Sequence, residues 1–328
     1  MFILTCAITI GSYRFTRAEG VEIEKSSRLL ADLAVIKVPS YAYIAGERVE
    51  PAKIFKAGDR VTIELGYEGV YGGVEYSGFV KHISEGNPIE IECEDNTWLL
   101  RQRNYTQSWR STTIKEVLEY VTSDSGIELA GDVPDITLKP FYLKNVNGAQ
   151  VLERLKTDYG LTVYFDRDCR LYAGLAYKED RGLIRYTLPY RNNNQNKLYE
   201  VNVISSSLKY RRAEDVKLRI RAVHIRQDNT LLEVECGDPE GELRTLYSYD
   251  IANAKQLKEW AETEISKYKY TGYEGNITTF LIPYSEYGMT ARVVDPQYGH
   301  DGLYYIEAVK TSYGQSGARR EVELGIRV

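Results

Sequence analysis

The sequence predicts a mainly β protein with an α+β insert, in which two related small β-barrel or sandwich domains flank a helix-containing middle domain. Near the carboxyl terminus are four alternating runs, residues 277–282, 289–294, 304–309 and 321–328, with Pro283 and Gly288 between the first two. A period of two interrupted by turn residues is typical of short antiparallel strands. The first hundred residues have the same character, and helical patterns lie between. We therefore expect domains at residues 1–105, 106–190 and 191–328.

Composition favours a globular protein of more than one domain. The chain has 328 residues, of which 43% are apolar and 27% charged, and this excludes wholesale disorder. Its 28 tyrosines favour strands whose sheet faces are half exposed, because a tyrosine ring packs while its hydroxyl keeps a polar end. A broad protein-binding or sugar-binding surface is the alternative interpretation.

The first domain is expected to hold strands near residues 3–16, 20–38, 60–66, 74–83 and 88–94. A turn at 56–59 precedes an alternating run in which Val61, Ile63 and Leu65 share one face. Twist and the hazard of unpaired edges favour a sheet that curls into a barrel or sandwich. The apolar start of the chain lacks a basic region and is too short to span a bilayer, so we expect a strand there and neither a signal peptide nor a membrane anchor.

The middle domain contains a repeat with an offset of 34 residues. Val-Leu-Glu at 117–119 followed by Gly126 matches Val-Leu-Glu at 151–153 followed by Gly160. Two helix-plus-strand units are therefore expected, with the two glycines ending the helices. Each helix starts with a capping pattern, Thr113 with Glu116 in the first and Asn147 with Gln150 in the second. A hairpin is expected at 161–173, turning at 166–169.

The third domain is expected to begin after a polar loop or linker at residues 191–196. Strands follow near 200–210, 215–226 and 230–236. A helix at about 251–270 has apolar residues recurring at three and four positions, and Gly272 is expected to end it. The four carboxy-terminal strands complete this second β-domain.

No pattern predicts a catalytic, cofactor-binding or metal-binding residue. His82 and His224 lie in expected strands, and His300 lies in an expected turn at 298–302, so no two histidines have metal-ligand spacing. A Gly-x-Ser-x-Gly elbow, a P-loop and a dinucleotide fingerprint are all absent from the sequence. We expect the chain not to be an enzyme.

The cysteines are also expected to be structural. Cys6, Cys93, Cys169 and Cys236 are far apart and form no CxxC pair, so neither zinc nor a redox pair is indicated. All but Cys169 lie within alternating or apolar runs, where a reduced, buried thiol is the default. A reducing compartment fits this usage.

The charged residues do not indicate a nucleic-acid-binding surface. The net charge of -5, without a basic block, is unlike that of a nucleic-acid-binding protein. Arg211-Arg212 and Arg319-Arg320 are expected to be strand-end or turn charges. Glu90, Glu92 and Glu94, which precede Asp95, could suggest a paired-carboxylate hydrolase, but a solvated strand face is the expectation. Asp166-x-Asp168 lacks the Gly and distal Glu of a calcium loop and is expected to form a hairpin turn.

Several segments together resemble the baseplate hub proteins of contractile-tailed phages, the late control protein D and Mu-type tail protein group, which are similar to the hub part of type VI secretion spike proteins. The segments that carry the resemblance are residues 55–61, 76–80 leading to 89–95, 151–166, and 302–309 before Gly317. They occur in the same order and spacing, although none is specific alone. The resemblance covers nearly the whole chain.

The resemblance implies a structural protein of a phage or prophage tail. It implies a homotrimer whose two similar β-domains per chain form a ring of six, joining a threefold spike to a sixfold tail tube. Implied partners are the spike protein, the tail tube and baseplate wedge proteins, with DNA passing unbound. The implied location is the virion tail baseplate, after assembly in the bacterial host cytoplasm. Tyrosine-rich strand faces are then expected at the ring contacts, with the insert outside.

Two other classes stay open at this point. One is a carbohydrate-binding or adhesin module built from tyrosine-rich β-domains, which would predict an exported protein. The other is a tail peptidoglycan hydrolase, which would need a paired acid and base in a cleft. The sequence lacks a signal peptide pattern for the first and a convincing carboxylate pair for the second.

Overall fold

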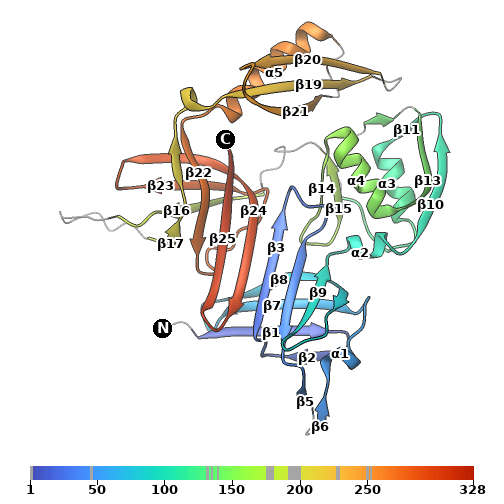
Figure 1. Cartoon of the computed structure of the whole chain (residues 1–328), viewed down its shortest axis with the longest axis vertical. Coiled ribbons are helices and arrows are strands. Elements are labelled where there is room, and N and C mark those ends of the chain that lie inside the picture. Colours follow the sequence, from blue (N-terminus) through green and yellow to red (C-terminus); the bar gives the residue numbers. More distant parts are fainter. Residues whose placement is uncertain are drawn as a thin grey trace.

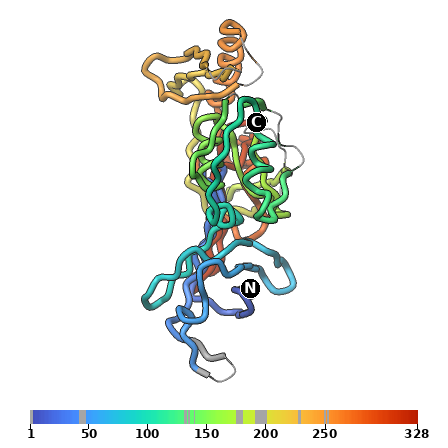
Figure 2. Tube along the Cα trace, turned by 90° about the vertical axis from the view of Figure 1, so that its right-hand side faces the viewer, coloured from blue at the N-terminus to red at the C-terminus, as the bar shows by residue number. Residues whose placement is uncertain are grey.

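A computed structural model shows a mainly β chain with few helices (Figure 1). The structure describes residues 3–44, 47–130, 133, 136–138, 140–174, 181–190, 201–226, 230–248, 251 and 253–328. The molecule is elongated, with a small sheet and a helix at one end of its long axis and the hairpin β5–β6 at the other (Figures 1 and 2). No helix in these described ranges is both long and apolar enough to cross a membrane.

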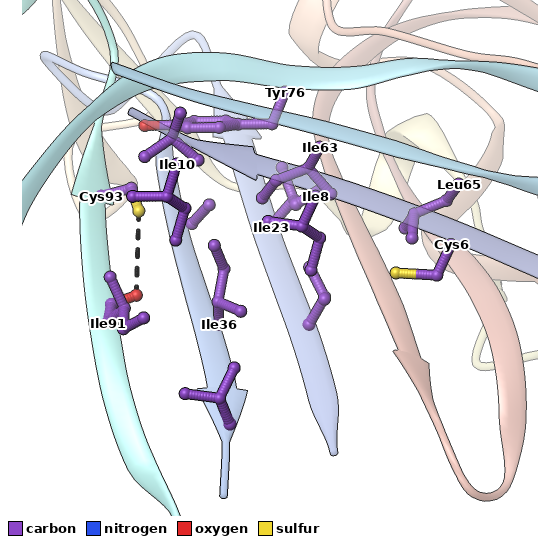
Figure 3. Packing of buried hydrophobic residues seen from close by; sticks show 14 of the residues in the cluster. Cys6, Ile8, Ile10, Ile23, Ile36, Ile63, Leu65, Tyr76, Ile91 and Cys93 are labelled. Carbon is purple, nitrogen blue, oxygen red and sulfur yellow. Dashed lines mark hydrogen bonds between the residues drawn. The ribbon is translucent and has the colours of Figure 1, made fainter. Parts of the chain in front are cut away.

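The first β-block is built on an antiparallel sheet with one buried face, and β5 and β6 form a separate two-stranded sheet. Its elements are β1 (Leu4–Ile10), β2 (Tyr13–Phe15), β3 (Gly20–Ser26), β4 (Leu33–Val38), β5 (Ala42–Ile44), β6 (Glu47–Val49), α1 (Pro51–Ile54), β7 (Arg60–Tyr67), β8 (Tyr71–Ile83) and β9 (Ile89–Glu94). Alternate residues such as Ile8, Ile36 and Ile63 point into a common core (Figure 3). The expected strand at 20–38 is in fact two strands, because a turn separates β3 from β4.

The insert is built on the predicted repeat. It follows the short helix α2 (Thr97–Leu100) and contains β10 (Asn104–Trp109), β11 (Thr112–Thr113), α3 (Ile114–Thr122), β12 (Thr137–Leu138), β13 (Phe141–Asn147), α4 (Gly148–Tyr159), β14 (Thr162–Phe165) and β15 (Leu171–Gly174). Both capping boxes are confirmed, at Thr113 and at Asn147. Gly160 ends α4 in the left-handed conformation with φ 61°, as predicted.

The two repeat units differ after their helices. The helix α3 already ends at Thr122, before Gly126, so the expectation that this glycine stops it is wrong. In the described residues directly after it, the pairing is a single bridge between Leu129 and Leu171. Only the second unit continues into a full hairpin, β14–β15, around the predicted turn. The repeat therefore preserves the helices and their caps but not the strands.

The last part of the chain contains a second β-block and a small separate sheet. Its elements are β16 (Leu183–Thr187), β17 (Val203–Ser206), β18 (Lys209–Arg211), the 3₁₀ turn η1 (Ala213–Asp215), β19 (Leu218–Ile225), β20 (Leu231–Gly237), β21 (Glu242–Ser248), α5 (Ala254–Tyr268), β22 (Gly272–Thr279), β23 (Thr290–Asp295), β24 (His300–Gly314) and β25 (Gly317–Arg327). The predicted linker at 191–196 lies outside the described residues. Helix α5 packs on β19 and β20 through Leu257 and Ala261, so these elements form their own small core.

One sheet runs through both β-blocks. Its strand order is β17-β22-β25-β24-β3-β4-β9-β8-β7-β1-β2, and β16, β18 and β23 pair to the side. The antiparallel pairing of β3 with β24 joins the blocks, and Lys25 there lies opposite Val309. The predicted fold class, mainly β with a helix-containing insert between two β-rich parts, is confirmed. The sequence pattern did not predict that these two parts share a sheet.

The caps of the insert provide a stability test. Replacing Asn147 by Ala removes the side-chain acceptor for the backbone N–H of Gln150, so we expect the free energy of unfolding to fall by about 1 kcal/mol. Urea unfolding monitored by circular dichroism measures this change. The matched control is Glu153→Ala, on the exposed face of the same helix, and it should change stability little. Equal losses in both variants would contradict the capping role.

Candidate functional site at a charged junction

The structure keeps the three histidines on separate strands. His82 lies in β8, and His224 lies in β19 with its Nδ1 2.9 Å from the Ser248 carbonyl oxygen. His300 is the first residue of β24 and stacks on Tyr210 with ring centroids 4.1 Å apart, so its expected place in the turn is wrong. Within the described ranges, no three His, Cys, Asp or Glu side chains come close enough together to hold a metal ion.

The four cysteines are free thiols. Cys6 and Cys93 are buried as predicted, and burial raises the pKa of Cys6 to about 11 and that of Cys93 to about 12. Cys236 is only half-buried, because β20 is the edge strand of its small sheet. The two thiols of the first block are therefore protonated, poorly reactive core residues.

The acidic run on β9 is not a uniformly solvated face. Glu92 is exposed, but the Glu94 side chain is only 1% exposed. Both Glu94 oxygens accept hydrogen bonds from Arg101, with the Arg101 Nη2 2.6 Å from Oε1. The expectation of a solvated strand is therefore wrong at Glu94, which needs its arginine because an unpaired buried carboxylate is strongly disfavoured.

Asp166 organises a hairpin turn, as predicted. Its Oδ1 accepts backbone hydrogen bonds from Asp168 and Arg170, each at 2.9 Å. Its Oδ2 accepts a hydrogen bond from the Arg170 Nε at 2.8 Å. These contacts hold the turn between β14 and β15.

Arg320 is the largest departure from the sequence expectations. It was expected to be a strand-end or turn charge, but it lies within β25 and is 1% exposed. Its Nη2 lies 2.8 Å from Oε1 of Glu75 on β8, and Glu75 is 2% exposed. The ion pair therefore connects the second β-block to the first. Alternation alone could have assigned Arg320 to the buried face, since Ala318 and Val322 on either side point inward.

The remaining guanidinium donors of Arg320 are satisfied by the same region. Nη2 also donates to the Leu281 carbonyl oxygen at 3.1 Å, and Nη1 donates to the Ser285 carbonyl oxygen at 3.2 Å. Tyr71 donates to Glu75 at 2.6 Å. Burial by itself would lower the pKa of Arg320, but the charge and hydrogen bond of Glu75 raise it above the ordinary value. Both members of the ion pair thus have further hydrogen-bond partners within the chain.

A second buried carboxylate, Glu286, gathers cations from all three parts of the chain. Lys25 of β3 lies 3.4 Å away, Arg167 of the insert 3.2 Å and Arg181 3.5 Å. Tyr284 also donates a hydrogen bond to it at 2.9 Å. Burial would raise the pKa of Glu286, but these cations, with Lys25 and Arg181 foremost, lower it below the ordinary value. Glu286 is therefore charged and shared between the parts.

Two further carboxyl groups lie beside this cluster. Asp95 accepts backbone hydrogen bonds from Asp32 and Thr97, both at 2.8 Å. Burial raises the pKa of Asp32 to about 8, although the charge of Lys25 opposes this shift. Burial also raises the pKa of Asp95 to about 6. The proton affinity of Asp32 thus makes the region sensitive to pH.

We refer to these groups as the charged junction: Lys25, Asp32, Glu75, Asp95, Arg167, Arg181, Tyr284, Glu286 and Arg320. All of them except Arg181 and Arg320 line a cavity of about 460 Å³ that is formed by both β-blocks and the insert. The junction cations and the carboxylates Glu75 and Glu286 are engaged with one another. The arrangement is suited to holding three structural units together, and its perturbed pKa values follow from this pairing and burial.

Removing Arg320 tests the junction directly. Arg320→Met leaves Glu75 as an uncompensated buried charge, and we expect the free energy of unfolding to fall by about 3–5 kcal/mol. The double variant Glu75→Leu with Arg320→Met should lose less than the single variant, because no charge is then left unpaired. Arg319→Met, one position away, is the control and should have a much smaller effect. A double variant less stable than Arg320→Met would contradict this account.

The pKa of Asp32 predicts a pH effect. The folded state binds this proton up to about pH 8, whereas an ordinary Asp releases it near 3.8, so Asp32 removes stability as the pH rises between these values. Asp32→Asn should therefore gain stability relative to the unchanged chain across this window. Urea unfolding at a series of pH values measures the difference. Glu240→Gln, on an exposed turn, should show none, and a flat Asp32→Asn difference would refute the assignment.

Comparison with known proteins identifies the fold. No protein-family model matches the chain, and no curated protein matches it in sequence. A tail protein from Neisseria meningitidis MC58 is similar in structure, with a TM-score of 0.65, 12% identity, and coverage of 99% of this chain and 96% of that one. The 43 kDa tail protein of prophage MuSo2 from Shewanella oneidensis also has a TM-score of 0.65, with 15% identity and 98% of each chain covered.

A type VI secretion protein shares the architecture. The E. coli c3393 protein, described as a component of that system with structural similarity to the phage T4 tail proteins gp27 and gp5, matches with a TM-score of 0.55 and 12% identity. The match covers 97% of this chain and 76% of that one. The resemblance expected from the sequence is thus confirmed for the fold: the chain has the architecture of phage and prophage tail proteins and of type VI secretion spike-related proteins.

Proposed function

We propose that this chain is a structural subunit of the baseplate hub in a phage or prophage tail. In this proposal three copies form a ring, each contributing two β-blocks, so that a threefold spike meets a sixfold tail tube. The fold shared with tail proteins over nearly the full length of the chain supports a tail role. The proposed partners are the spike, the tail tube and the baseplate wedge proteins, and the location is the virion tail after assembly in the host cytoplasm.

The single sheet that passes through both β-blocks carries this proposal. A ring that matches threefold to sixfold symmetry needs two blocks per subunit held at a constant angle. The pairing of β3 with β24 and the buried pair Arg320–Glu75 provide that constraint. If the connection were flexible, the six blocks would move independently. The ring would then lack the regular sixfold spacing that binding to a tube requires.

A structural role without catalysis is part of the proposal. Asp32 and Asp95, the two carboxyl groups whose pKa values are raised, lie in the charged junction. There they serve packing between parts of the chain, and no histidine lies among the residues that line the cavity. The arrangement supports a scaffold better than a hydrolase.

The tyrosine-rich ring contacts expected from the sequence need revision. Many tyrosines of the second block are buried within the chain, among them Tyr186, Tyr270, Tyr273 and Tyr304. Buried rings cannot contact a neighbouring subunit. Tyrosines that are exposed, such as Tyr298 at 73%, stay available. Tyrosine content therefore reflects the core more than an interface.

The mass of the purified protein tests the ring. We expect light scattering across a dilution series to give three times the chain mass of 37.5 kDa for the protein alone, or three chains plus the spike mass when the trimer forms on the cognate spike protein. Adding that spike protein should give a complex with three hub chains for each spike trimer. A protein that stays monomeric at every concentration, with and without the spike, would contradict the proposed function.

A further inference from the structure

The first β-block contains an apolar groove on its surface. The groove has a volume of about 440 Å³ and is lined by aromatic and aliphatic side chains: Tyr13, Phe15, Pro39, Pro51, Ile54 and Phe55. The Tyr13 and Phe55 rings meet edge to face at 5.9 Å, and Phe15 stacks on Phe55 at 6.2 Å. These rings form a rigid, partly exposed hydrophobic floor, which is the kind of surface that accepts a small apolar anchor.

The charge of this groove is positive. Among the described residues that line it, the charged ones are Arg14 and Arg17. Arg14 makes a weak exposed contact of 3.7 Å with Glu64, and Arg17 makes no ion pair with the described residues of its own chain. A segment that combines an apolar side chain with a carboxylate would therefore complement the groove.

Such a segment occurs at the tip of the β7–β8 hairpin. Val70 is 56% exposed there and Ile3 beside it is 62% exposed. The Glu68 backbone N–H donates to the Ile3 carbonyl oxygen at 2.9 Å, which places the backbone of Ile3 against the hairpin turn. The Glu68 side chain is exposed and forms no ion pair with the described residues. We call Ile3, Glu68 and Val70 the hairpin tip.

The groove and the hairpin tip lie at opposite ends of the same strands. Leu4 at the start of β1 pairs with Tyr67 next to the tip, and Ile10 at its end pairs with Tyr13 in the groove. Six residue steps along a strand separate them by about 20 Å. Figure 1 shows this separation, with the amino terminus on one side of the first block and α1 on the other. One chain therefore cannot fill its own groove with its own tip.

We infer that the hairpin tip of one copy of this chain docks in the groove of the next copy, with Val70 on the aromatic floor and Glu68 beside Arg17. A contact between two different surfaces of identical chains is heterologous and generates a ring when the rotation closes. The inference deepens the proposed function and rests on it, because it supplies the subunit contact of the ring. A second copy is the occupant because the same chain carries both surfaces, with unpaired charges of opposite sign.

A polar substitution at the tip tests the contact. Val70→Asp places a carboxylate where the aromatic floor requires an apolar group, so the concentration needed for assembly should rise about tenfold or more. Leu231→Asp is the matched control, since Leu231 is 54% exposed on the separate small sheet. It should assemble like the unchanged chain. Thermal unfolding of both variants checks that the fold is retained, as expected for exposed positions.

Charge reversal at Glu68 and Arg17 is the second test of the proposed contact. Glu68→Arg and Arg17→Glu should each weaken assembly, because each places like charges together across the contact. The double variant carrying both changes restores opposite charges and should recover assembly. A structural defect would not be rescued in this way, so recovery identifies Glu68 and Arg17 as partners across the interface.

The possible results distinguish failure of the proposed docking contact from failure of the proposed trimeric ring. If the unchanged chain forms a trimer and Val70→Asp assembles equally well, the docking inference is overturned while the proposed function stands. If the unchanged chain stays monomeric with and without the spike, both are overturned. A photo-reactive side chain at position 70 should crosslink to the segment containing Phe55 in another copy. A crosslink to any other segment, or to another protein, would also overturn the inference.

Discussion

Strands β3 and β24 pair from Ser26 opposite Ala308 to Gly20 opposite Gly314, and this ladder joins residues nearly three hundred positions apart. It turns two β-blocks, each with its own core, into a single sheet. Backbone pairing of this kind is directional, so it sets the angle between the blocks as well as their contact. The insert and the charged junction are placed relative to this sheet.

Burial of charge at the junction follows from the way the sheet brings the parts together. Arg320 of β25 faces Glu75 of β8, while Glu286 attracts Lys25, Arg167 and Arg181. Such a network adds little net stability compared with apolar packing, but each member strongly disfavours any arrangement that leaves its partner unpaired. The junction therefore favours one relative position of the three parts. That specificity suits a subunit of a symmetric assembly.

Local signals in the sequence predicted local features well. The capping boxes at Thr113 and Asn147 and the hairpin turn at Asp166 depend on residues three or four positions apart, and all three are present. The pairing of β3 with β24 depends on residues far apart in the chain, and no periodicity in either strand indicates its partner. Sequence periodicity predicts strands and their faces, but not which strands meet.

The burial of charged residues also depends on contacts that are distant in the sequence. Arg320 and Glu94 were expected at the surface because charged side chains are rarely buried. Arg320 is buried against Glu75 of β8, and Glu94 is buried against Arg101, which follows α2. The alternation of buried Ala318 and Val322 along β25 would have assigned Arg320 to the inward face, so the pattern is a better guide than residue type in this case. The pairing itself needed three-dimensional proximity that a single sequence does not display.

The proposed role requires the two β-blocks to behave as one rigid unit, and native-state hydrogen exchange measures this most directly. Amides in the ladder between β3 and β24 should exchange with the same opening free energy as those between β7 and β8 inside the first block. That result would mean that the blocks open together, in global unfolding. Markedly lower protection in the β3–β24 ladder alone would show that the blocks separate while each stays folded, and would contradict the account.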